Sequence, residues 1–266
     1  MRTPIPFVLL LALALLHTSC GAVSQALGIE DPAGRQAVDS VELSSFESAL
    51  LATSVDAADL TKTVNEIADD AALAGNTIFQ PSGCAIVNAN GATVTYQLTN
   101  CTGPYGLNSA TGQAIAVYTL SGDTLNVNLT ATNLSVENST LSINSNATYS
   151  VTGTEKNLVV QTSGVGTGAN GTVVTRAGQY TADWETATGC MRLNGAWTNT
   201  IGEEAWGTNV TNYEKCGLGC PKSGGNIIFA GTSGTTVTVE FNGTSAANVL
   251  SNEGNIFGTV SLECNS

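Results

Sequence analysis

A two-residue alternation of apolar and polar side chains runs through most of this chain and leaves few folds open to it. The stretch STLSINSNATYSV keeps five apolar residues on one face: Leu141, Ile143, Ala147, Tyr149 and Val151. The alternation recurs at residues 94–98, 125–129 and 237–241, with Thr and Asn prominent on the opposite face. Because successive side chains of a strand point to opposite faces, the pattern predicts antiparallel strands with one side in water. We expect about ten to twelve of them.

Short turns join the predicted strands. Asn90–Gly91 and Asn242–Gly243 are hairpin dipeptides, because Asn and Gly accept the positive φ of tight turns. A β-solenoid is the alternative fold, since the stretch NLTATNLSVENSTLSIN has the monotony of stacked rungs, but the chain lacks the fixed repeat that a solenoid needs. We predict a mainly β fold over residues 76–266, either a long antiparallel meander sheet or a sandwich or half-barrel, held by disulfides.

Residues 36–75 have a helical periodicity instead. One apolar stripe is spaced i, i+4, i+7 and i+11: Leu60, Val64, Ile67 and Ala71. Asp56 or Ser54 is expected to cap the start of this helix, and Gly75 to end it. A shorter and weaker helix is expected before it, over residues 38–50. The short helical segment should cover part of an apolar sheet face.

The chain begins like an exported protein. Arg2 is followed by ten unbroken apolar residues, Phe7 to Leu16, and then by small or polar residues. Ten residues of helix rise only about 15 Å, half the thickness of a bilayer core, so this run is too short to span a membrane. Residues 1–19 are therefore predicted to be a signal peptide.

The end of the signal resembles the lipobox of bacterial lipoproteins, in which a Leu-rich run leads to small residues and a Cys followed by Gly or Ser. The matching residues are Leu16, Thr18, Ser19, Cys20 and Gly21, and the sequence departs from the motif at His17. The resemblance implies that Cys20 carries palmitate or similar acyl chains, with residues 20–35 as a tether. Gly21 in place of Asp implies an outer-membrane location, on its periplasmic or surface side. Cleavage after Ala22, with loss of Cys20, is the alternative.

The number of cysteines fits an oxidising compartment. Of the seven, Cys20 does not count toward disulfides, because it is either acylated or lost with the signal, and the remaining six can close three disulfides. Many pairings are open to six cysteines, and each bond would contribute roughly 2–4 kcal/mol. We expect the sequential pairing: Cys84–Cys101, Cys190–Cys216 and Cys220–Cys264.

Charge and histidine content argue against several functions. The chain has 8 basic and 21 acidic residues. Loss of Arg2 with the signal leaves a net charge of −14, which would repel nucleic acid, so we predict no nucleic-acid partner. His17, the only histidine, lies in the signal. The mature chain therefore cannot build a Ser-His-Asp or Cys-His site or a His-ligated metal site. We predict no catalytic residue, no cofactor and no metal.

Carboxylates remain as the only acid–base candidates. Asp183 and Glu185 flank Trp184, and Glu203 and Glu204 precede Trp206. A glycosidase needs two carboxyl groups about 5 to 10 Å apart around a sugar. Asp183 and Glu185 would share one face of a strand, but both pairs are more simply interpreted as solvated strand-end and turn residues.

Trp197 and Trp206 are placed by the register of one hairpin. In one register they are diagonal neighbours on the same face, where they would either stack on sugars or pack in the core; a one-residue slip separates them onto opposite faces. A pairing of Cys190 opposite Cys216 belongs to the slipped register unless a β-bulge intervenes. Core packing is the simpler interpretation.

The C-terminal third resembles the tail of a group of uncharacterised β-rich bacterial lipoproteins. The resemblance rests on the Cys-Pro and Ser-Gly opening at residues 220–224, the strand VTVEFNG at 237–243 and the last cysteine, Cys264. It implies a β-rich fold and a cell-envelope location, and it brings no activity with it.

We therefore expect an exported, lipid-anchored envelope protein with a non-enzymatic binding or structural role and a protein or glycan partner on its sheet face. Two alternatives stay open: a carrier of a lipid or acyl chain between sheet and helix, and a carboxylate-dependent glycosidase. A large apolar cavity would favour the carrier, a filled core the scaffold, and a cleft with paired carboxylates the enzyme.

Overall fold

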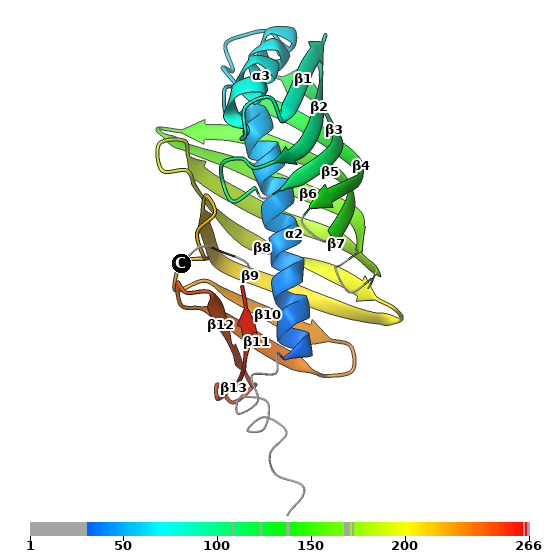
Figure 1. The fold of residues 1–266 in the computed structure, drawn as a ribbon, viewed down its shortest axis with the longest axis vertical. Helices are drawn as coiled ribbons and strands as arrows, with labels where there is room; N and C mark the ends of the chain where they lie inside the picture. Colours follow the sequence, from blue (N-terminus) through cyan, green and yellow to red (C-terminus); the bar gives the residue numbers. More distant parts are fainter. Residues whose placement is uncertain are drawn as a thin grey trace, which may run out of the picture.

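The computed structural model describes residues 31–107, 109–122, 124–136, 139–167, 171, 173–262 and 264, so the predicted signal peptide and Cys20 lie outside the described residues. Figure 1 shows the arrangement of the helices and strands. The helices are α2 (Pro32–Val55) and α3 (Val64–Ile78). The strands are β1 (Ala85–Asn90), β2 (Thr93–Cys101), β3 (Ala110–Ser121), β4 (Thr124–Val136), β5 (Ser139–Thr152), β6 (Glu155–Thr167), β7 (Val173–Glu185), β8 (Cys190–Ile201), β9 (Glu204–Cys216), β10 (Asn226–Gly231), β11 (Thr236–Phe241), β12 (Ala246–Leu250) and β13 (Ile256–Ser261).

All thirteen strands form one antiparallel sheet in chain order, and the sheet is not closed. This confirms the predicted meander, with slightly more strands than expected, and the β-solenoid alternative is wrong. Both predicted hairpin dipeptides lie at turns, with Gly91 and Gly243 at φ of 58° and 84°. Neither helix in the described part of the chain is long and apolar enough to cross a membrane.

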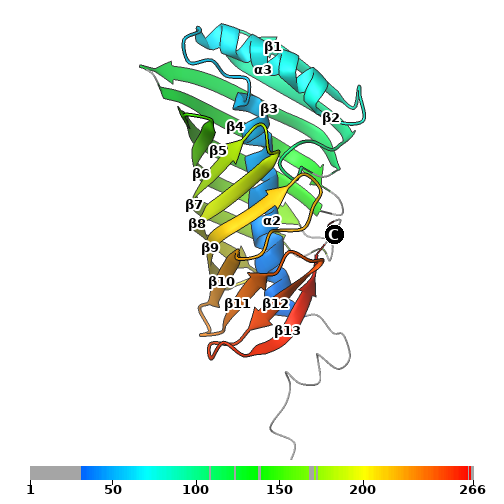
Figure 2. The ribbon, with the colours of Figure 1, turned by 90° about the vertical axis from the view of Figure 1, so that its left-hand side faces the viewer.

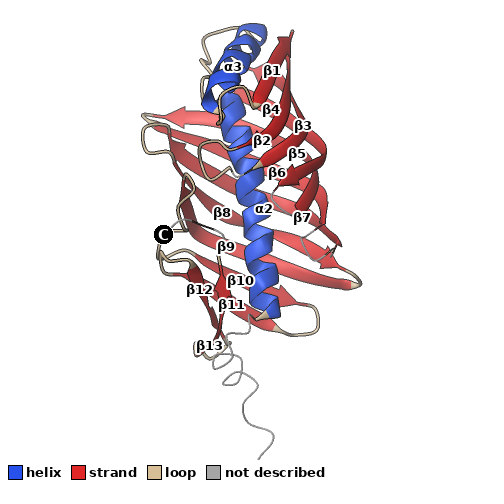
Figure 3. Ribbon diagram, viewed as in Figure 1, coloured by secondary structure: helices blue, strands red, loops and turns tan. Residues whose placement is uncertain are grey.

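Helix α2 lies inside the curve of the sheet, with its axis crossing the strands (Figures 1 and 2). Its first turn packs on β12 and β13, where a Cβ atom at Gly34 would meet Val249 and Val260. Its last turn points toward α3. Figure 3 shows the helices in blue against the strands in red. A single apolar core fills the space between them.

Helix α2 is the longer of the two helices, although the sequence predicts the shorter one there and places residues 32–35 in the tether. Residues 44–55 are all buried, so this half of the helix has no polar face that periodicity could detect. Ser44, Ser48 and Thr53 nevertheless tolerate burial because each hydroxyl donates to the carbonyl four residues earlier, at 3.1, 2.7 and 2.6 Å.

Helix α3 differs from the prediction at both ends. Thr63 is its N-cap and forms a capping box with Glu66, whereas Asp56 instead ends α2. Gly75 lies within the helix, which continues to Ile78. A Cβ atom at Gly75 would lie 3.0 Å from Val87 and 3.2 Å from Tyr96. The glycine therefore lets α3 approach the inner face of β1 and β2 closely, where helix termination had been expected.

Three β-bulges share one sequence pattern. Each has Thr-Asn between two buried residues, and each Asn has a φ of 51° or 52°. The backbone N–H of that Asn donates to a side chain of the strand opposite, at 2.8 to 2.9 Å. Both residues of the dipeptide face outward, so the inward alternation resumes after three positions. The bulges lie at residues 98–101, 131–134 and 210–213.

The first strand has its free edge covered by a side chain. Asn76 of α3 accepts from the Val87 N–H at 2.9 Å and donates to the Val87 carbonyl at 2.8 Å. This amide therefore imitates a neighbouring strand at one position, and it leaves less of β1 open to pairing with another chain.

The close approach of β8 to Gly178 of β7 can be tested by substitution. A Cβ atom there would lie 2.4 Å from Trp197 Cβ and 2.6 Å from the Ala196 carbonyl oxygen. We expect Gly178→Ala to lower the free energy of unfolding by about 1–3 kcal/mol through overpacking, measured by urea denaturation with intact disulfides. Gly207→Ala is the control, because its nearest atom would be 3.8 Å away and the added methyl has room. Equal stability of the two variants would contradict this packing.

Candidate functional site

The first predicted carboxylate pair lies on the outer face, apart from its tryptophan. Asp183 accepts from Asn157 Nδ2 at 2.5 Å, and Glu185 accepts from Thr154 Oγ1 at 3.2 Å. Trp184 points to the opposite face and is 2% exposed. Because alternate residues of a strand face opposite ways, this pair shares one face but has no aromatic floor.

The second predicted carboxylate pair, Glu203 and Glu204, lies at the end of the sheet strands opposite to the end that holds Asp183 and Glu185. Glu203 is exposed in the turn before β9, and Glu204 accepts from Ser233 Oγ at 2.6 Å. Trp206 is buried inside, stacked on Phe229 with ring centroids 4.6 Å apart. The structure does not bring the two pairs together, since Val174 at the start of β7 lies opposite Ile201 while Asp183 is near the end of β7.

The hairpin β8–β9 satisfies both registers considered for the tryptophans. Cys190 lies opposite Cys216, while Trp197 lies opposite Thr208 in the register shifted by one residue. The bulge after Leu193 reconciles them. Trp197 and Trp206 therefore share the inner face and are 4% and 7% exposed. They pack in the core, and an outward sugar-stacking platform is excluded for these two residues.

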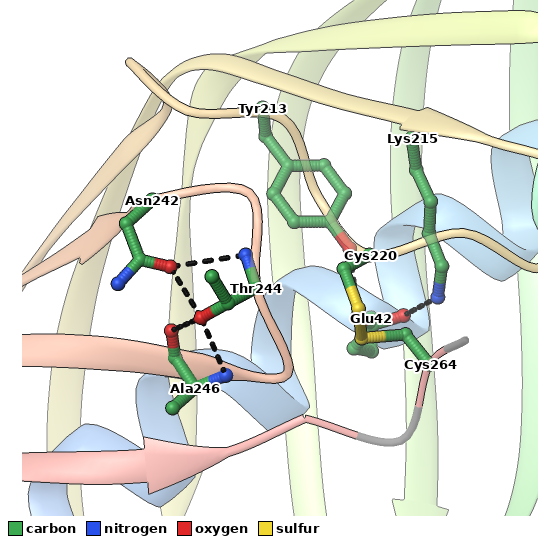
Figure 4. Close-up of a disulfide and its surroundings, with 8 residues drawn as sticks. All are labelled: Glu42, Tyr213, Lys215, Cys220, Asn242, Thr244, Ala246 and Cys264. Atoms are coloured by element: carbon green, nitrogen blue, oxygen red, sulfur yellow. Dashed lines mark hydrogen bonds and ion pairs between the residues drawn. A yellow bond between two sulfur atoms is a disulfide. The ribbon is translucent and has the colours of Figure 1, made fainter. Parts of the chain in front are cut away.

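Two acidic residues of α2, and Asp56 at its C-cap, each meet a basic residue of the sheet. Near the middle of the helix, Glu42 accepts from Tyr213 Oη at 2.7 Å and from Lys215 Nζ at 2.9 Å (Figure 4). The Lys215 side chain is 3% exposed. This contact lies beside the Cys220–Cys264 disulfide, which ties the segment after β9 to the end of the chain.

The second contact, between Glu47 and Arg176, is fully buried. Glu47 Oε2 lies 3.3 Å from Arg176 Nη2, and Ser145 Oγ donates to the other carboxylate oxygen. The guanidinium carbon lies 5.2 Å from the centroid of the Trp197 ring. A buried charge without its partner is strongly destabilising, so this pair depends on both residues.

The third contact is formed by Asp56 at the end of α2. Asp56 Oδ1 accepts from Lys156, Tyr105, Trp184 and Thr186 at 2.8 to 3.1 Å. Burial alone would raise the pKa of this carboxyl, but the hydrogen bonds from Lys156, Trp184 and Thr186 outweigh it and hold the pKa below its usual value. Lys156 also donates to the Asp56 carbonyl, which places a cation at the helix C-terminus. The site is saturated with donors and fastens the helix end to the sheet.

Sequence reasoning missed these contacts, although a signal for one of them was present. Arg176 occupies an inward position of a strand whose other inward residues include Tyr180, Ala182 and Trp184. A charged residue at an inward position requires a buried partner. The identity of that partner, Glu47, depends on where α2 crosses the sheet.

The cysteines form the three expected pairs: Cys84–Cys101, Cys190–Cys216 and Cys220–Cys264. Cys190, Cys216 and Glu214 are the one group of possible metal ligands among the described residues, with ligand atoms within 4.8 Å of one another. Both sulfur atoms are already joined in a disulfide, so the group is not a metal site as it stands.

The outer face of the sheet is largely polar and almost free of charge, with a few exposed apolar side chains among its hydroxyl and amide groups: Ile86, Val117, Val159, Val165 and Ile228. One row of amides crosses four neighbouring strands, with Asn128 opposite Asn146, Asn146 opposite Gln161, and Gln161 opposite Gln179. Outward charges on the described parts of β3–β9 gather at one end of the strands: Glu155, Asp183, Glu185, Arg192 and Glu214.

A shallow hollow lies on this face across β4, β5 and β6. Its outward-facing lining consists of Thr130, Thr132, Ser142, Asn144, Ser163 and Val165. The β4 bulge forms one side, because it turns two consecutive residues outward. The hollow has hydrogen-bonding groups and no charged residue in its lining.

Comparison of the chain with protein-family models, with curated proteins and with solved structures finds no match. The functional interpretation therefore rests on the residues and their geometry.

Loss of one partner of the buried Glu47–Arg176 pair should be strongly destabilising, and replacing the second partner should compensate. We expect Arg176→Met to lower the free energy of unfolding by about 3–5 kcal/mol, because Glu47 is left buried and unpaired. Adding Glu47→Leu should restore most of the loss. Arg192→Met is the matched control, because its 3.3 Å pair with Glu155 is exposed and should change stability by less than about 1 kcal/mol. Urea denaturation checks all three, and an Arg176 variant no weaker than the control would contradict the buried pair.

The buried tyrosines should ionise only at a pH above the ordinary tyrosine pKa, together with alkaline unfolding. All six are buried, and burial raises the pKa of each; that of Tyr118 and of Tyr149 rises to about 12. Because the folded pKa lies above the unfolded value of about 10, this stabilisation is present below pH 10 and is lost as the pH rises toward 12. Tyrosinate absorbance should therefore stay flat through about pH 10 and rise together with the loss of circular dichroism. A tyrosine that titrates normally in the folded protein would contradict this.

Proposed function

We propose that this protein is an exported, lipid-anchored component of the cell envelope, and that it presents the outer face of its sheet to a partner in a non-enzymatic binding role. The proposal depends on one observation, which is that the two faces of the sheet differ in what covers them. Helix α2 occupies the inner face, whereas the outer face offers uncharged hydrogen-bonding side chains to solvent.

The filled interior supports binding over transport. Residues 44–55 of α2 are buried on every side, and one continuous core joins the helix to the sheet. A carrier of a lipid or acyl chain would need an apolar space at this position. The same observation therefore weakens the carrier alternative, and the separated carboxylate pairs weaken the glycosidase alternative.

The position of the first helix fits an anchor at one end of the molecule. The described chain starts at Asp31, next to β12 and β13 (Figure 1). Cys20 lies outside the described residues, and a tether of about 11 residues would reach at most about 40 Å. An acylated Cys20 would hold the sheet near the membrane while leaving its outer face accessible. The three disulfides are consistent with the oxidising surroundings of the envelope.

Site-specific photo-crosslinking in cells of the native host tests the proposal. A photoreactive amino acid replaces Gln161 in the centre of the outer face, and Leu73 on α3 in a matched control, since Leu73 is 71% exposed but lies on another surface. We expect a crosslinked envelope component at position 161 and none at 73. A Cys20→Ala variant should leave the membrane fraction and lose the crosslink.

Crosslinks that form at neither outer-face position 161 nor the neighbouring position 179 would contradict the binding role. Membrane attachment that survives Cys20→Ala would contradict the anchor. Intact-mass spectrometry of the wild type supplies an independent check, because acylation at Cys20 adds the mass of the acyl chains.

A further inference from the structure

We infer that the hollow across β4, β5 and β6 is a binding site for a neutral oligosaccharide segment. This inference rests on the proposed function, since it names the class of partner that the outer face recognises.

The hollow holds hydrogen-bond donors that no other described residue uses. Asn128 Nδ2 donates to Asn144 Oδ1 at 3.1 Å and to Asn146 Oδ1 at 3.0 Å. This arrangement fixes both amides with their oxygens toward Asn128, so the Nδ2 group of Asn144, which lines the hollow, remains available. The hydroxyls of Thr130 and Thr132 make no side-chain hydrogen bond within the described residues.

Ser142 adds a further oriented donor. Its Oγ accepts the backbone N–H of Asn133 at 2.9 Å, at the β4 bulge, which leaves its own hydroxyl proton free to donate. Ser163 Oγ donates to the Asn144 carbonyl at 3.4 Å and keeps its lone pairs for a ligand. Donors from β4 and β5 and an acceptor from β6 thus face one opening, on positions held by the backbone of the sheet.

Charge excludes the ionic classes of ligand. No carboxylate lines the hollow, so a cation has no counter-charge there. An anion also finds no counter-charge in the hollow. Each of the seven basic residues of the described chain already forms an ion pair with a carboxylate within 4.0 Å. The net charge of −13 for the whole sequence opposes anion binding further.

The hollow also offers apolar surface between its hydroxyl and amide groups. Val165, 41% exposed, is the large apolar side chain that opens toward solvent in the lining, and hydroxyl and amide groups surround it. A ligand that fits must be uncharged, rich in oxygen acceptors, and long enough to extend along a flat polar face. Neutral oligosaccharides meet these three requirements, with ring C–H groups against Val165 and hydroxyl oxygens on the donors.

Binding of neutral oligosaccharides by the full-length, detergent-solubilised protein tests the inference. A glycan array of neutral hexasaccharides identifies the best one, and isothermal titration calorimetry measures its affinity. We expect the double variant Thr130→Val, Thr132→Val to weaken binding at least about tenfold, because valine keeps the shape of threonine but removes the hydroxyl. Asn144→Leu should have a similar effect.

Thr95→Val is the matched control, since Thr95 faces outward on β2 outside the hollow, and its affinity should equal that of the wild type. The inference is overturned if no neutral hexasaccharide binds, if only charged glycans bind, or if the double variant binds as well as the control. It is also overturned if the surface is occupied by a second copy of this chain, seen as a homotypic crosslink at position 161. If no neutral glycan binds but position 161 still crosslinks to another envelope component, only the glycan is rejected. If neither glycan binding nor that crosslink is found, the proposed function is rejected as well.

Discussion

Burial of a polar helix inside one curved sheet is the constraint on which the rest of this structure depends. Helix α2 has no side open to water over its second half, so its polar groups need partners within the fold. The hydroxyls of Ser44, Ser48 and Thr53 donate to the helix's own carbonyls. Glu42, Glu47 and Asp56 pair instead with three basic residues of the sheet: Lys215, Arg176 and Lys156. The three ion pairs lie at successive positions along the helix. They therefore define both its rotation and its height against the strands.

The same constraint organises charge over the whole molecule. Basic residues are scarce, and three of the seven in the described part of the chain are used to hold α2. The remaining four pair with carboxylates near the surface. Free negative charge is left to the helices, turns and strand ends, and the centre of the outer face stays neutral. A neutral, hydroxyl- and amide-bearing sheet on a strongly acidic protein is suited to uncharged, hydrogen-bonding ligands, which is why the proposed function is placed there.

Some elements of the fold could be predicted from local sequence patterns, and others could not. The alternation at residues 139–151, the hairpin at Gly91 and the sequential cysteine pairs all depend on neighbours in sequence or on adjacent strands, and they were predictable. A bulge in the β8–β9 hairpin was left open by the sequence and its position at Asn212 was not predicted, although the same Thr-Asn pattern recurs at Asn100 and Asn133. With the bulge in place, the two competing registers for Trp197 and Cys190 coexist in one hairpin. Helix α2 was underestimated because its periodicity disappears when all sides are buried.

The sequence by itself determined a one-sided antiparallel meander, its turns, its disulfide order and the scarcity of proton-transfer groups, because these follow from alternation, glycine and asparagine placement and composition. Only the tertiary structure decided which face each tryptophan occupies, which carboxylate meets Arg176 and where the outer hollow lies. Those contacts join residues more than a hundred positions apart or depend on a one-residue bulge. Their formation is governed by the curvature of the whole sheet around α2, a property that no local stretch of sequence contains.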